Sequence, residues 1–99
     1  MKKPNSFTAE AAENLAIQAL TYLAADGTRL ERFLGMTGIT PEGLRTAAAA
    51  PGFLGGVLDH VVSDETLLTG FAAQAGIDPA ALMRARAALG HADWEREVP

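Results

Sequence analysis

The sequence predicts an all-α fold, a compact bundle of five or six short helices built as two similar helix-turn-helix halves. Apolar residues recur at the three- and four-residue spacing of helices, and no segment shows the period-2 alternation of a strand. Alanine, which favours helix, supplies much of the 48% hydrophobic content. One helical pattern also occurs twice, because residues 20–50 align with residues 58–88 at a spacing of 38.

The identical pairs of this repeat fall at caps, turns and apolar anchors, which are positions that determine structure. No pair is a plausible catalytic group, so the repeat says much about the fold and little about function. The pairs are Leu20/Leu58, Asp26/Asp64, Thr28/Thr66, Leu30/Leu68, Phe33/Phe71, Gly38/Gly76, Ile39/Ile77, Pro41/Pro79, Leu44/Leu82, Ala47/Ala85, Ala49/Ala87 and Ala50/Ala88.

Three helices are expected in the first half. Thr8 has a suitable side chain to cap the first helix. Either Asp26 or Thr28 caps the second, since a glutamate follows Thr28 at capping-box spacing. The third is expected over 41–50, and Pro51 stops it. The expected core residues are Ala12, Leu15, Ala16, Ala19, Leu20, Leu23, Leu30, Phe33, Leu34, Leu44, Ala47 and Ala48.

Three further helices are expected in the second half. A fourth helix covers 52–62, Asp64 caps a fifth, and a sixth covers 79–89 until Gly90 ends it. The expected core residues are Phe53, Leu54, Val57, Leu58, Val61, Leu67, Leu68, Phe71, Ala72, Ala75, Leu82, Ala85 and Leu89.

The same turn is predicted at 38–41 and 76–79, where the sequence is Gly-Ile-Thr/Asp-Pro. Glycine just past a helix end adopts the left-handed conformation at little cost, so a positive φ is expected at Gly38 and Gly76. Threonine or aspartate then accepts hydrogen bonds from the next helix, and proline suits its first position.

A length of 99 residues suits one domain, expected over 8–90, with frayed termini at 1–7 and 91–99. The net charge of −4 argues against a protein that coats nucleic acid or an anionic membrane. There is no cysteine, which excludes disulfides and thiolate metal sites. Neither a signal-peptide core nor a membrane helix is recognised, so the protein is interpreted as cytoplasmic by default.

No catalytic, cofactor-binding or metal-binding residue is predicted. The glycine-rich segment 52–56 lacks the lysine and preceding strand of a phosphate loop, and its paired glycines suggest a close helix crossing. His60, Ser63 and Asp64 are near enough in sequence for a hydrolytic triad, but the last two are better explained as a helix cap. The two histidines and scattered carboxylates match no metal-ligand spacing.

Residues 67–88 fit the pattern of a DNA-binding helix-turn-helix, with a glycine in the turn and apolar anchors in each helix. The second helix nevertheless offers mainly alanine, which cannot read base donors and acceptors. Phosphate contacts would depend on few cations, and Arg45, Arg84 and Arg86 are the candidates. A single basic face containing all three would favour DNA binding.

Trp94 lies in the charged tail, where it either folds back on the domain or anchors a partner. The favoured functional hypothesis is a protein–protein interaction or adaptor domain without catalytic activity, whose protein partner and oligomeric state are unknown. The alternative is a helix-turn-helix DNA-binding protein, although nucleic acid is not the expected partner. A membrane partner is not expected either.

The chain also resembles a bacterial family known as the domain of unknown function numbered 3572. The resemblance covers about 8–90 and rests on the order of several segments. It implies a small bacterial cytosolic protein with no established activity, and no site residue carries over. The matching segments are 13–20 (ENLAIQAL), 33–41 (FLGMTGITP), 53–59 (FLGGVLD), and Asp64-Glu65 followed by Phe71 and 76–79 (GIDP).

Overall fold

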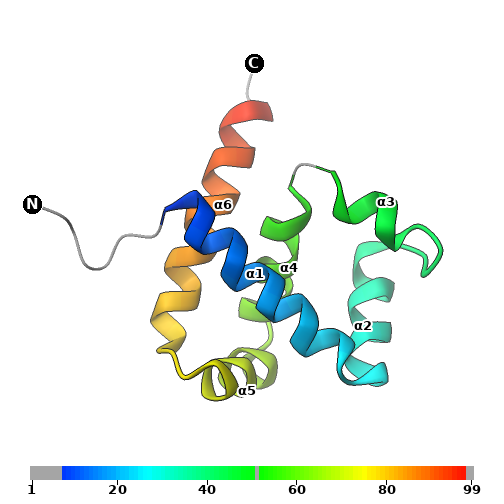
Figure 1. The fold of residues 1–99 in the computed structure, drawn as a ribbon, viewed down its shortest axis with the longest axis horizontal. Helices are drawn as coiled ribbons and strands as arrows, with labels where there is room; N and C mark the ends of the chain where they lie inside the picture. The colour runs from blue at the N-terminus through cyan, green and yellow to red at the C-terminus, as the bar shows by residue number, and fades with distance from the viewer. Residues whose placement is uncertain (1–7, 51, 98–99) are drawn as a thin grey trace, which may run out of the picture.

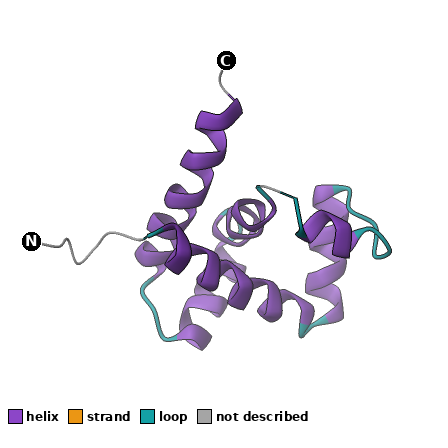
Figure 2. Cartoon of the chain, turned by 45° about the horizontal axis from the view of Figure 1, so that its top comes forward, coloured by secondary structure: helices purple, strands orange, loops and turns teal. Residues whose placement is uncertain are grey.

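The computed structural model describes the backbone of residues 8–50 and 52–97, and the side chains of residues 8–50 and 52–89. Every regular element in this part of the chain is a helix, which confirms the all-α prediction (Figure 2). The expected frayed segment 1–7 lies outside the described residues. The helices are α1 (Ala9–Ala24), α2 (Gly27–Thr37), α3 (Leu44–Ala48), α4 (Phe53–Val62), α5 (Glu65–Ala75) and α6 (Pro79–Glu97).

Short polar side chains begin four of the helices, one of them Asp78, whose Oδ1 accepts from the backbone N–H of Ala80 at the start of α6. The Thr8 hydroxyl accepts a hydrogen bond from the backbone N–H of Ala11 at the start of α1. Asp26, and not Thr28, is the cap of α2, and Asp64 caps α5. Both aspartates have extended backbones and accept from the second and third N–H groups of their helices, which satisfies donors that a helix start leaves free.

Gly38 and Gly76 end α2 and α5 with positive φ values of 77° and 73°, which confirms the predicted conformation at both turns. Each glycine closes its helix by donating its backbone N–H to a carbonyl of the last turn. Other residues avoid this left-handed region, because a Cβ atom would crowd the backbone.

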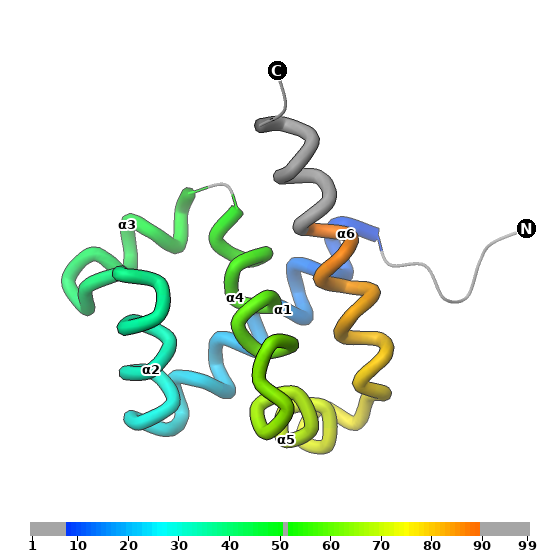
Figure 3. The backbone as a smooth tube through the Cα atoms, turned by 180° about the vertical axis from the view of Figure 1, so that it is seen from behind, coloured from blue at the N-terminus to red at the C-terminus, as the bar shows by residue number. Residues whose placement is uncertain are grey.

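The helices are arranged around the crossing of α1 and α4 (Figure 1). Seen from behind, α4 lies in front of α1, with α6 on one side and α2 and α3 on the other (Figure 3). The most extensive helix contacts are those among α1, α4 and α6, and α5 closes one end against α4 and α6. The core therefore sits between α1, α4 and α6, and α3 packs at its edge, mainly against α4.

Most of the expected core residues are buried. All those expected in α1 except Leu20 are below one-tenth exposed, as are all those expected in α4 except Leu54 and all three expected in α6. The predicted core residues agree less well with the structure in α2 and α3. Of their six expected core residues only Phe33 is buried, while Ala48 is exposed. The 3.6-residue period finds the inward face of each helix, but it does not tell how deeply that face is covered.

Two helix boundaries differ from the prediction. The third helix was expected over 41–50, but α3 is shorter, because residues 41–43 form a turn in which the Gly43 N–H donates to the carbonyl and hydroxyl oxygens of Thr40. The sixth helix was expected to end at Gly90, whereas α6 continues to Glu97. The helix therefore includes residues 91–97 of the expected tail, and residues 98–99 lie outside the described residues.

The two halves match only in part. The aspartate caps and the glycine turns are alike at positions 38 residues apart, but the segments after the turns differ, since α3 has 5 residues and α6 has 19. The prediction of two similar halves is therefore not confirmed as a whole. No helix in the described chain is long and apolar enough to cross a membrane.

Candidate functional site

Two hollows of about 260 Å³ each share Tyr22, near the end of α1, as part of their walls. We call the first the charged cavity, which lies at the starts of α2 and α5. We call the second the uncharged groove, which lies between α1 and α5. The charged cavity is lined by Tyr22, Asp26, Thr28, Arg29, Arg32, Asp64, Thr66 and Leu67. The uncharged groove is lined by Ile17, Gln18, Thr21, Tyr22, Phe71, Gln74 and Ala75.

The Tyr22 ring is held in place by contacts from α2 and α5. Its centroid lies 5.5 Å from that of the buried Phe71, and the Arg29 guanidinium lies 4.0 Å above it. Arg29 also donates from Nη1 to the Tyr22 carbonyl oxygen at 3.0 Å. Gly70 leaves room for the phenol, because a Cβ atom at that position would collide with the Tyr22 hydroxyl. An aromatic wall fixed in this way presents a preformed surface to both hollows.

The charged cavity contains as many carboxylates as guanidinium groups. Arg29 Nη2 lies 3.7 Å from Asp26 Oδ2, and Arg32 Nη1 lies 3.8 Å from Asp64 Oδ2. Both distances exceed hydrogen-bond length, so each guanidinium keeps donors for another acceptor. The two aspartates also cap α2 and α5, and their negative charge disfavours a free anion here.

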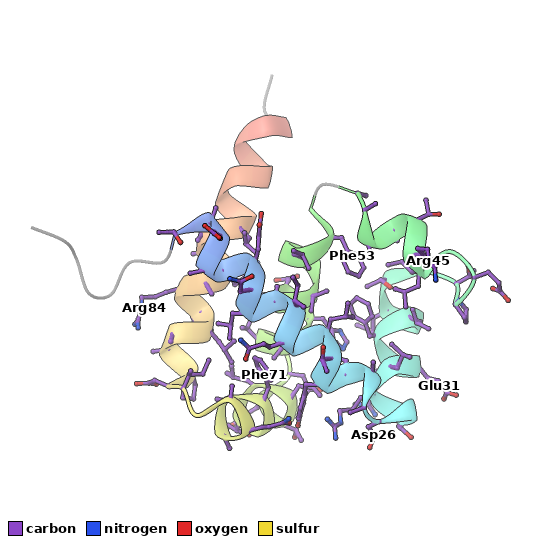
Figure 4. The ribbon with its side chains drawn as sticks, viewed as in Figure 1. Asp26, Glu31, Arg45, Phe53, Phe71 and Arg84 are labelled. Atoms are coloured by element: carbon purple, nitrogen blue, oxygen red, sulfur yellow. The ribbon has the colours of Figure 1, made fainter. Side chains whose placement is uncertain are left out.

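The uncharged groove differs in chemistry, since none of its lining residues carries a charge. Phe71 forms its buried floor with 2% exposure, while the side chain of Ile17 is 51% exposed. Figure 4 shows Phe71 directed into the bundle between α5 and α1. An exposed isoleucine beside aromatic surface gains free energy when a partner excludes water from it.

The three residues considered for a hydrolytic triad are not brought together. The Ser63 hydroxyl donates to the backbone carbonyl of His60 at 3.0 Å, not to its ring. Asp64 Oδ1 accepts from the N–H groups of Thr66 and Leu67. His60 Nε2 is buried and has no hydrogen-bond partner among the described residues. No group of His, Asp and Glu in the described chain is arranged to hold a metal ion.

The paired glycines of α4 have different environments. Gly55 is buried, which fits a packing position. Gly56 is exposed, and a Cβ atom there would meet nothing within 4 Å, so the expected close helix crossing is wrong at this residue.

The arginines considered for DNA binding are not gathered on one face. Arg45 on α3 and Arg84 on α6 lie at opposite sides of the molecule (Figure 4). Arg86 donates from Nε to Asp59 Oδ1 at 2.6 Å, which ties α6 to α4 and offsets the charge of the arginine. Trp94 lies in the last turns of α6, and its side chain is outside the described residues.

Tyr22, Arg29 and Arg32 were not singled out in the sequence as site residues. The sequence feature that could have indicated Tyr22 is the repeat, in which Tyr22 of the first half occupies the same position as His60 of the second half. Each of these two rings packs against the other half's repeated phenylalanine, Tyr22 on Phe71 and His60 on Phe33.

The comparisons with known proteins identify the family. The family model described as "Protein of unknown function (DUF3572)" matches residues 9–92, so the chain belongs to this family, as its segments suggested. No curated protein and no solved structure shows a significant match to it.

Proposed function

We propose that this DUF3572 protein is a small non-catalytic protein-interaction domain that binds its partner through the charged cavity and the uncharged groove. The observation that carries the proposal is that Tyr22 forms part of the wall of both hollows. Aromatic residues and arginine contribute most to the affinity of protein interfaces, and here a fixed tyrosine stands between an exposed apolar residue and two arginines.

The surface chemistry suits a polypeptide better than a small anion or a nucleic acid. The uncharged groove favours an apolar side chain, and the charged cavity offers both donors and acceptors to a polar segment. Interfaces commonly combine an apolar centre with a polar rim in this way. A cytoplasmic location is part of the proposal.

The experiment that tests the proposal is affinity capture from the source cells, quantified by mass spectrometry, with two matched variants. Ile17 and Met83 are both 51% exposed, but Ile17 lines the uncharged groove and Met83 lies on α6. We expect Ile17→Glu to lose the captured partner and Met83→Glu to keep it. If both variants keep it, or both lose it, the partner binds elsewhere and the proposed surface is wrong.

DNA binding is tested by gel retardation with random duplex at low salt, where weak electrostatic binding is strongest. We propose that no shift occurs, because Arg45 and Arg84 lie far apart and Arg86 is paired with Asp59. A shift that weakens steeply as salt rises, and that Arg84→Ala abolishes, would overturn the interaction proposal in favour of DNA binding.

A further inference from the structure

The segment that holds α2 and α3, residues 27–48, contributes few buried side chains to the core, and it contacts the other helices through α2 on α1 and α3 on α4. We call it the α2–α3 arm. Phe33 is the only fully buried residue of α2, and α3 has none. The other core residues come from α1, α4, α5 and α6. Several apolar side chains of the arm, including Leu30, Leu34 and Leu44, pack against the core only partly buried.

Phe33 anchors the arm by packing against two rings of α4. Its centroid lies 6.2 Å from that of Phe53 and 5.2 Å from that of His60, with both pairs close to edge-to-face. The phenylalanine itself is 1% exposed. One side of this anchor is therefore a titratable ring.

The His60 ring is placed so that gaining a proton is unfavourable. Its Nε2 atom is buried without a hydrogen-bond partner in the described chain. The neutral ring tolerates this position as an unprotonated nitrogen. A charged imidazolium would instead bury an N–H donor with no acceptor, because both of its nitrogens carry protons.

Three charged groups act on the His60 ring, and none of them partners Nε2. Asp64 at the start of α5 uses Oδ1 to cap its helix, and Asp59 on α4 uses Oδ1 to bind Arg86. Arg32 on α2 repels the imidazolium. Burial has the largest effect and lowers the pKa of His60; Asp64 raises it, Arg32 lowers it and Asp59 raises it.

We propose that the α2–α3 arm is a pH-responsive element that loosens from α4 when the His60 ring takes up a second proton. Moving the ring toward water satisfies the new N–H donor but removes one of the two rings that hold Phe33. The apolar side chains of Phe33 and Phe53 then become accessible. The arm is closed at neutral pH and opens as the pH falls below the ordinary histidine value of about 6.5.

Amide hydrogen exchange measured by mass spectrometry tests the proposal on the full chain between about pH 7.5 and about pH 5, the range in which histidine titrates. After correction for intrinsic exchange chemistry, exchange in peptides from the α2–α3 arm should rise relative to peptides from α1 and α4. One proton is linked to opening, so the rise reaches at most about tenfold for each pH unit below about 6.5.

Two variants of His60 and one matched control complete the test. His60→Phe keeps a ring against Phe33 without a titratable nitrogen, and His60→Gln is the second variant should the first fail to fold. Either should keep arm exchange independent of pH. His91→Gln removes the other histidine and should behave like the parent. A parent arm whose relative exchange does not change with pH, or a change that persists without His60, would overturn the proposal.

Discussion

Replacing Phe33 with alanine tests how the α2–α3 arm is held. The ring is 1% exposed and packs on Phe53 and His60, so its removal leaves a cavity at the only fully buried position of α2. Truncation of a buried phenylalanine costs about 3–5 kcal/mol. A domain of this size has roughly 5–15 kcal/mol of total stability. Because little else in the arm is fully buried, we expect the arm to unfold before the other helices.

The assay is urea unfolding monitored by the far-ultraviolet circular dichroism signal of the helices. The α2 and α3 helices contain 11 and 5 residues, about a fifth of all helical residues in the described chain. Phe33→Ala should therefore lose about that share of the signal before the main transition. Phe71→Ala is the matched control, since Phe71 is 2% exposed at the equivalent repeat position, and it should lower the midpoint of one transition.

The reasoning is refuted if Phe33→Ala retains full helical signal and unfolds in one transition with the parent's denaturant dependence. That slope reports the surface exposed on unfolding, so an unchanged slope would mean that the arm unfolds together with the core.

The remaining predictions concern three glycines and one titration. Gly76→Val should destabilise the protein by about 1 kcal/mol or more, because a branched side chain is strained at φ 73°. Gly56→Ala should raise the melting temperature, since alanine favours helix by about 0.5–1 kcal/mol and its Cβ meets no neighbour. Gly70→Ala should give no such gain, because its Cβ meets the Tyr22 hydroxyl. The free energy of unfolding should be highest above about pH 6.5 and should fall as the pH is lowered. Burial lowers the pKa of His60 in the folded protein, so the unfolded chain takes up a proton more readily than the folded one.

Thermal melts at several pH values check all of these expectations. A Gly76→Val melt that matches the parent would remove the argument from positive φ. Equal increases in melting temperature for Gly56→Ala and Gly70→Ala would show that the Tyr22 side chain can move away from residue 70 at little cost. A stability profile that is the same with His60→Phe would assign the acid dependence to other groups.

Only part of the candidate site was accessible from the sequence. Of the two caps that form part of the charged cavity, Asp64 was predicted from local pattern, and Asp26 was one of two candidates with Thr28. Tyr22 and the arginines of α2 were not predicted, because their role depends on α2 and α5 starting beside each other. Arg86 was considered for DNA, and its partner Asp59 is 27 residues away in the chain, beyond the reach of local reasoning.

The sequence by itself determined the features that depend on hydrogen bonds and sterics within a few residues. These are the helical class, the caps at Thr8 and Asp64, and the left-handed glycines at Gly38 and Gly76. The tertiary structure alone decided how far each helix continues and how much of each is buried. The short α3 and the long α6 follow turns of the same sequence type, but α6 packs on α1 and α4 while α3 has little core to cover it. The stability of a helix comes mainly from the apolar face it buries, and that face depends on neighbours distant in the chain.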